Sequence, residues 1–218
     1  MRTVLLWAGP LLELAVVAGL IHRGRIRRAY LLPVFLVALA ASAVIVGVCA
    51  PCNTWRFWIA KESIHAGLAL ALGVEVAWRV FRPLPGAAGA AAATAAAVAL
   101  LTGFVLFAAP EEHPAVALLP ALAGGLACFY TGLVLTMMSF LIPADPLHAA
   151  VLLGLAPYMV LYAALWPAAR DPFMREVAAW ATPLMLVLAL LLLLRVAWVR
   201  DSAPAAPLSL VRLLWPWR

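Results

Sequence analysis

The stretch WRFWIAKESIHAGLALALGVEVAWRVF, residues 55–81, decides the fold because it is long and apolar enough to cross a membrane as a helix. It nevertheless contains Lys61, Glu62, His65 and Glu75. A charged side chain at the centre of a bilayer costs about 2.5–3.5 kcal/mol even on lenient insertion scales. The polar residues of this stretch therefore need a protein environment, which means neighbouring helices.

Six residues of this stretch recur at intervals of three or four and share one face of a helix, namely Lys61, His65, Leu68, Leu72, Glu75 and Arg79. Polar side chains in a bilayer face other helices or a cavity, so we expect this face to point into a bundle. Lys61 and Arg79 can extend to opposite membrane surfaces, and Arg79 can pair with Glu75 one turn earlier. His65 has no such outlet, and Glu62 lies about 100° away around the helix.

The composition of the whole chain indicates an integral membrane protein whose main partner is the lipid bilayer. Of its 218 residues, 67% are hydrophobic and 11% are charged, against about 45–50% and about 25% in soluble domains. Long apolar runs without the alternation of barrel strands predict an all-α fold. The formal charge of +6 collects at the ends of apolar runs, as in HRGRIRR at 22–28, so it marks topology and does not indicate nucleic-acid binding.

Charge clusters and Pro/Gly turns divide the chain into seven apolar segments, each near the length of about 20 residues that spans a bilayer. The predicted spans are 4–21, 29–50, 57–81, 87–109, 116–142, 147–166 and 177–199. The sequence therefore predicts a polytopic transmembrane bundle of seven helices over residues 1–200, with short loops. Residues 201–218 are predicted to form a cytoplasmic tail that ends in an interfacial amphipathic helix.

The basic residues beside the helix ends predict the orientation. With the amino terminus outside, ten arginines fall on the inner side and five basic residues on the outer side. The inner set is Arg23, Arg25, Arg27, Arg28, Arg79, Arg82, Arg195, Arg200, Arg212 and Arg218. We therefore expect a multi-pass protein with the amino terminus outside and the carboxyl terminus inside.

Glu13 is a second ionisable residue within the predicted membrane region. At a rise of about 1.5 Å per residue it lies about 14 Å from the outer end of its helix, close to the depth of His65. A carboxylate alone at that depth needs a partner or a proton, and His65 or Lys61 can serve if the first and third helices touch. Two interpretations stay open, a structural hydrogen bond between helices and a proton or cation site.

The motif CAPC places Cys49 and Cys52 at the spacing of thiol–disulfide motifs, on the predicted outer side. A disulfide or an inert thiol pair is the simplest interpretation. A redox relay to a membrane quinone normally needs a second cysteine pair, and only Cys128 remains. The sequence has no zinc set, phosphate loop or nucleophile motif, so we predict no metal and no cofactor and identify no catalytic residue.

The motifs WRFWIAKE and GVEVAWRVF within 55–81, together with a basic first connector and seven spans joined by short loops, resemble a broad group of uncharacterised bacterial seven-helix inner-membrane proteins. In that group an aromatic-rich start of the third helix precedes a polar pair, and a Glu followed by an aromatic and a basic residue ends it. The resemblance implies the topology, a multi-pass location in a bacterial inner membrane, and a structural role for Glu62, Glu75 and Arg79. It implies no activity.

Three functional hypotheses follow. The first is a sensor-like or scaffold membrane domain that acts through a protein partner or as a homo-oligomer, because seven helices with short loops and no catalytic set resemble sensory membrane domains. The second is a small proton- or ion-coupled transporter that uses Glu13, His65 and helices kinked at Pro10 and Pro157. No convincing inverted repeat supports this second hypothesis. The third is a membrane thiol oxidoreductase.

Overall fold

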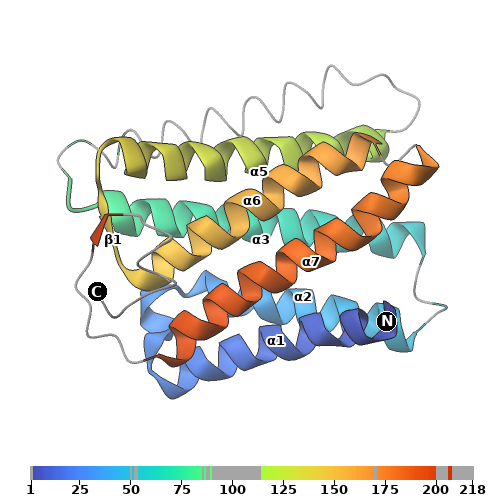
Figure 1. The fold of residues 1–218 in the computed structure, drawn as a ribbon, viewed down its shortest axis with the longest axis horizontal. Helices are drawn as coiled ribbons and strands as arrows, with labels where there is room; N and C mark the ends of the chain where they lie inside the picture. Colours follow the sequence, from blue (N-terminus) through green and yellow to red (C-terminus); the bar gives the residue numbers. More distant parts are fainter. Residues whose placement is uncertain are drawn as a thin grey trace.

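The computed structural model describes residues 2–49, 51, 54–84, 86, 89, 114–168, 171–199 and 206–207. These residues form long helices that run side by side along the molecule (Figure 1). Five of the described helices contain a stretch long and apolar enough to cross a membrane. The predicted all-α class is confirmed. Of the predicted span 87–109 the structure describes only Gly89, so the count of seven helices stays a prediction.

The described helices are α1 (Arg2–His22), α2 (Leu31–Val48), α3 (Trp55–Phe81), α5 (Pro114–Ser139), α6 (Pro146–Ala168) and α7 (Pro172–Trp198). A short 3-10 helix, η1 (Arg25–Arg28), connects α1 to α2. The strand β1 (Pro143–Ala144), between α5 and α6, pairs antiparallel with β2 (Ala206–Pro207). This pairing fixes a short piece of the predicted tail beside the α5–α6 connector. The predicted interfacial helix of the tail lies outside the described residues.

Among the helices that begin earlier than the sequence predicts, α3 and α7 are preceded by capping side chains. At the start of α3, Phe57 N donates a hydrogen bond to Thr54 Oγ1 at 3.2 Å. At the start of α7, Met174 N donates one to Asp171 Oδ1 at 3.0 Å. Each bond satisfies a backbone N–H of the first turn, which has no partner inside its own helix.

The six described helices pack as a closed ring. Along the chain, α1 packs on α2, α2 on α3, α3 on α5, α5 on α6 and α6 on α7, and α7 returns to pack on α1. In Figure 1, α3 and α5 run in the same direction, whereas the other consecutive described helices alternate. The helix α2 separates α1 from α3 in this ring. The described residues therefore lack the close contact between the first and third helices on which the predicted Glu13 pairing depends.

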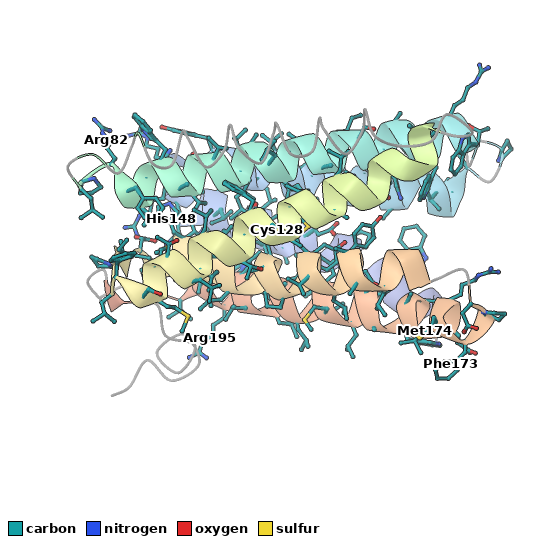
Figure 2. All side chains as sticks on the ribbon, turned by 90° about the horizontal axis from the view of Figure 1, so that it is seen from above. Arg82, Cys128, His148, Phe173, Met174 and Arg195 are labelled. Atoms are coloured by element: carbon teal, nitrogen blue, oxygen red, sulfur yellow. The ribbon has the colours of Figure 1, made fainter. Side chains whose placement is uncertain are left out.

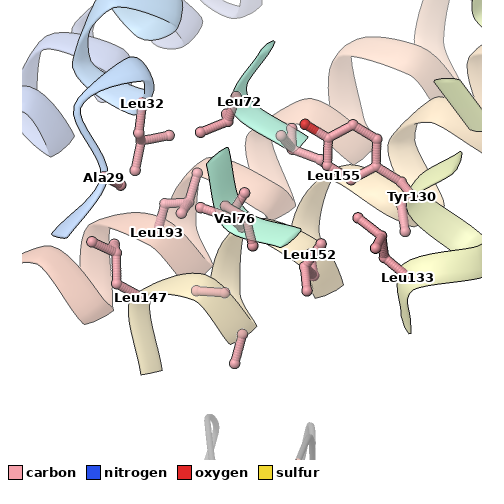
Figure 3. Packing of buried hydrophobic residues seen from close by; sticks show 14 of the residues in the cluster. Ala29, Leu32, Leu72, Val76, Tyr130, Leu133, Leu147, Leu152, Leu155 and Leu193 are labelled. Carbon is pink, nitrogen blue, oxygen red and sulfur yellow. The ribbon is translucent and has the colours of Figure 1, made fainter. Parts of the chain in front are cut away.

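The interior of the ring is an apolar core. Its fully buried side chains come from every described helix and include Leu72, Tyr130, Leu147, Leu152 and Leu193 (Figure 3). The hydroxyl of Tyr130 donates a 2.7 Å hydrogen bond to a backbone carbonyl oxygen of α3, which satisfies the polar end of this buried ring. Large apolar side chains on the outer surface, among them Leu11, Val48 and Leu135, are exposed, as expected for a surface that contacts lipid.

Two glycines allow neighbouring helices to approach closely. A Cβ atom at Gly73 of α3 would lie 2.5 Å from the ring of Phe129 on α5. A Cβ atom at Gly19 of α1 would lie 2.6 Å from the indole of Trp198 on α7. Small residues at such positions allow membrane helices to pack backbone against side chain.

Candidate functional site

A cavity of about 50 Å³ lies among α2, α3, α5 and α6. Its polar lining consists of Glu62 and His65 from α3 and of Tyr158 and Tyr162 from α6. The remaining lining is apolar and comprises Phe35, Leu39, Ala66, Leu122, Ala123, Leu126 and Met159. A water molecule needs about 10–15 Å³ by this type of measure, so the cavity has room for about three or four water-sized groups. A mostly apolar cavity with a few convergent polar groups is typical of small-ligand sites.

Glu62 has a partner on each carboxylate oxygen. Its Oε1 lies 2.8 Å from Lys61 Nζ in an ion pair, and the hydroxyl of Tyr162 donates to its Oε2 at 3.3 Å. The Lys61 and Glu62 side chains are only 20% and 18% exposed. The ammonium group of Lys61 thus pairs with its neighbour in sequence, and its predicted reach to the membrane surface stays a prediction. This pair places a charged group at the cavity without leaving it uncompensated.

His65 is oriented by hydrogen bonds to α2. Its Nε2 lies 3.2 Å from Ser42 Oγ and 3.4 Å from the carbonyl oxygen of Ala38. The hydroxyl of Ser42 already donates to the carbonyl oxygen of Leu39 at 2.8 Å. Both neighbours of Nε2 therefore act as acceptors, which assigns the ring hydrogen to Nε2 and leaves Nδ1 as the acceptor of the neutral ring.

Two tyrosines form the α6 side of the cavity. The rings of Tyr158 and Tyr162 are stacked, with centroids 6.2 Å apart and an interplanar angle of 24°. Tyr158 lines the same cavity as Glu62. Among the described residues its hydroxyl makes no hydrogen bond. This hydroxyl is therefore a polar group of the cavity that remains available to a ligand.

Among the described residues no direct hydrogen bond joins Glu13 to His65, whose Nε2 lies beside Ser42 and Ala38, so a contact between the two side chains through a single water stays a prediction. The side chain of Glu13 is 3% exposed, and its Oε2 has no hydrogen-bond partner among the described residues. The physical reason is the ring order, in which α2 lies between α1 and α3 and supplies Ser42 to His65. In the described part of the chain, this carboxyl oxygen is thus buried without a hydrogen-bond partner.

The polar face predicted for α3 does point into the bundle, since none of its six residues is exposed. At the end of α3 away from the cavity, Glu75 forms the expected ion pair with Arg79, with an N–O distance of 2.8 Å. The two carboxylate oxygens of Glu75 also accept hydrogen bonds from the backbone N–H groups of Tyr30 and Leu31, at 2.9 and 2.8 Å. Glu75 therefore caps the amino terminus of α2, where a negative charge is favourable.

The basic connector around η1 forms hydrogen bonds and an ion pair with the ends of α6 and α7. The sequence analysis did not predict this role. Arg25 is buried and donates hydrogen bonds to the carbonyl oxygens of Val196 and Val199 at the end of α7. Arg28 pairs with Asp145 at 2.7 Å, before the start of α6. His148 Nε2 lies 2.8 Å from the carbonyl oxygen of Arg28. In Figure 2, His148 lies toward the same end of the bundle as Arg82 and Arg195, opposite Phe173 and Met174.

Of the two described cysteines, one is oxidised and the other is reduced. Cys49 is disulfide-bonded, and Cys128, near the middle of the bundle in Figure 2, carries a free and exposed thiol. Cys52 lies outside the described residues, so the pair of Cys49 with Cys52 stays a prediction. Within the described part of the chain, no three His, Cys, Asp or Glu side chains come together to hold a metal ion.

The described fold and cavity define an α-helical membrane protein with a small polar site inside its bundle. No protein-family model matches the chain, and neither the curated proteins nor the solved structures give a significant match. The resemblance to the bacterial seven-helix group therefore gains no support from these comparisons. The functional argument rests on the geometry of the site.

Proposed function

We propose that this protein is a sensor-like membrane domain that binds a small ligand in the cavity and acts through a protein partner or a second copy of itself. The cavity carries the proposal, because it combines an apolar lining with His65, Tyr158 and the Lys61–Glu62 pair. No catalytic set accompanies these groups among the described residues. Ligand binding is thus a better account of the site than turnover.

The packing between the cavity and the η1 end favours a binding site over a transport path. Along α3, Leu72 and Val76 follow the cavity residues and have no exposed surface. Beyond them, the Glu75–Arg79 pair connects α3 to the start of α2. Side chains fill this half of the bundle, and hydrogen bonds connect its helices. Such packing supports a domain in which a ligand bound at the cavity changes the helix ends near η1.

The experiment uses the full-length protein in phosphatidylcholine nanodiscs and three probes of similar size, namely propylammonium, 1-propanol and propionate. A ligand that binds only the folded state stabilises it by RT ln(1 + [L]/Kd). We expect at least one probe to raise the thermal midpoint at millimolar concentration. Ala66→Leu, which fills the cavity, should remove the response, whereas Ala60→Leu on the exposed face of α3 should keep it. A response to none of the probes would refute the proposal.

A small proton- or ion-coupled transporter is the second candidate, and one observation favours it. The buried Oε2 of Glu13 has no hydrogen-bond partner among the described residues, and a group of this kind inside a membrane bundle is typical of proton and cation pathways. Proteoliposomes with an internal pH dye should then show protein-dependent proton or cation flux that Glu13→Gln abolishes. Wild-type vesicles that are as tight as empty ones would exclude this candidate.

We also propose that the protein resides in a bacterial inner membrane with its amino terminus outside and its η1 connector inside. The ten-to-five distribution of basic residues supports this orientation. Reporter fusions at Arg25 and Pro85 should both report a cytoplasmic location. A periplasmic signal at Pro85 would overturn this assignment.

A further inference from the structure

The charges at the cavity cancel, and this balance specifies the ligand more narrowly than the proposed function, on which this inference rests. Among the described lining residues, Glu62 is the one with a carboxylate, and none has an ammonium or guanidinium group. Lys61 compensates this carboxylate, since its Nζ lies 2.8 Å from Oε1 and both side chains are at most 20% exposed. A charged ligand would bring a further charge for which the described lining has no counter-charge, and burial makes such a charge costly.

His65 adds no charge to the site, because only one of its ring nitrogens has a hydrogen-bond partner in the described part of the chain. Its Nε2 lies 3.2 Å from Ser42 Oγ and 3.4 Å from the carbonyl oxygen of Ala38. A protonated ring would carry an N–H at Nδ1 as well, and a buried N–H without an acceptor is costly. The neutral ring instead offers Nδ1 as an acceptor.

Tyr158 supplies the unused polar group of the cavity. It lines the cavity from α6, and its hydroxyl has no hydrogen-bond partner within the described ranges. The hydroxyl of Tyr162, by contrast, already donates to Glu62 Oε2 at 3.3 Å. A phenolic hydroxyl can both donate and accept. Tyr158 therefore suits a ligand with one uncharged group that can do the same.

The remaining walls and the volume of the cavity limit the rest of the ligand. Phe35 and Leu39 of α2, together with Leu122 and Leu126 of α5, offer apolar surface that favours methylene and methyl groups. The volume of about 50 Å³ admits only a few non-hydrogen atoms. The ligand therefore has a short apolar chain.

We infer that the cavity binds a small uncharged molecule, namely a hydroxyl group on a short apolar chain, with Tyr158 as its hydrogen-bond partner. The cancelled charges, the unused hydroxyl and the apolar walls all favour this one chemistry. A hydroxyl group accepts a hydrogen bond from Tyr158 and retains an O–H for an acceptor such as Nδ1 of His65. An ammonium group or a carboxylate of the same size leaves its own charge uncompensated.

The test compares 1-propanol with propylammonium chloride and with sodium propionate in phosphatidylcholine nanodiscs at constant ionic strength. The response is the shift in thermal midpoint of the wild type minus that of Ala66→Leu, which removes effects of the probe on the bilayer. We expect 1-propanol to bind with an apparent affinity at least about tenfold above that of either charged probe. A charged probe that binds as tightly as 1-propanol would overturn the inference and leave the cavity as a binding site. A response to no probe would refute the proposed function as well.

Tyr158→Phe tests the hydrogen bond, because it removes the hydroxyl and keeps the ring. It should weaken the binding of 1-propanol about three- to tenfold, the change expected for the loss of one hydrogen bond between neutral groups. Tyr30→Phe is the matched control, since Tyr30 is exposed and lies outside the cavity, and it should leave the response unchanged. Equal affinities for 1-propanol in the wild type and Tyr158→Phe would overturn the inference.

Two further variants test the charge balance from opposite sides. Glu62→Gln leaves the ammonium group of Lys61 without its carboxylate, so propionate should gain affinity relative to 1-propanol. Lys61→Met leaves the carboxylate of Glu62 uncompensated, so propylammonium should gain instead. Unchanged probe preferences in these variants would contradict the role of the ion pair and overturn the inference. If neither variant folds, the comparison of probes in the wild type and the effect of Tyr158→Phe decide it.

Discussion

Replacement of Glu75 by Ala should cost about 2–3 kcal/mol of stability. The side chain is 12% exposed, and it accepts hydrogen bonds from the N–H groups of Tyr30 and Leu31. A donor left unsatisfied costs about 1–3 kcal/mol when buried. Leu31 N is partly buried and Tyr30 N is exposed, so the first loss is the larger. Arg79 loses its ion pair but keeps the carbonyl oxygen of Arg27 at 3.0 Å.

The assay has a local and a global component. Reversible unfolding in mixed micelles gives the free-energy change, and hydrogen exchange reports on the Tyr30 and Leu31 amides, which should exchange faster in Glu75→Ala. Glu75→Gln retains an acceptor oxygen and should cost about 1 kcal/mol. Glu176→Ala, on an exposed position of α7, is the matched control and should change stability by less than about 0.5 kcal/mol. A Glu75→Ala protein as stable as this control, with unchanged exchange, would refute the capping role.

Three further substitutions test the packing. Gly73→Ala should destabilise by about 1–3 kcal/mol because its Cβ meets the Phe129 ring at 2.5 Å, and a neutral effect would show that α3 and α5 separate easily. Tyr130→Phe should cost about 1–2 kcal/mol, measured in the same micelles, since it removes the donor to Ala69 O; no loss would show that this carbonyl finds another partner. Arg25→Met should lower the thermal midpoint and speed exchange at the end of α7, whereas faster exchange elsewhere alone would contradict its role there.

The sequence predicted the helices and their inward faces better than it predicted which helices are neighbours. Apolar runs and helical periodicity depend on a single segment, and they located the described spans and the inward face of α3. The depth of Glu13 and His65 was likewise a property of each helix alone. Their pairing depended on the order of helices around the ring, which periodicity does not encode, so Ser42 of α2 took the place expected for Glu13.

The cavity was predictable only in part for the same reason. Glu62 and His65 were candidates because ionisable groups are costly inside a membrane. Tyr158 and Tyr162 gave no such signal, since aromatic residues are common in apolar helices, and their spacing of four residues on α6 was the one available indication that they share a face. The ties made by the η1 connector also escaped prediction, because arginines at a helix end are explained equally well by topology alone.

The closed ring has a consequence for biogenesis. Helices enter the membrane in the order of synthesis, yet α1, which precedes the other described helices, has α7, the last of them, as one of its two neighbours. The indole of Trp198 packs against Gly19 of α1, and its N–H donates a 3.0 Å hydrogen bond to the carbonyl oxygen of Ala15. Before α7 is inserted, this surface of α1 lacks both contacts. A nascent chain that stops before Pro172 therefore leaves this surface of α1 uncovered, and the insertion of α7 is the step that covers it.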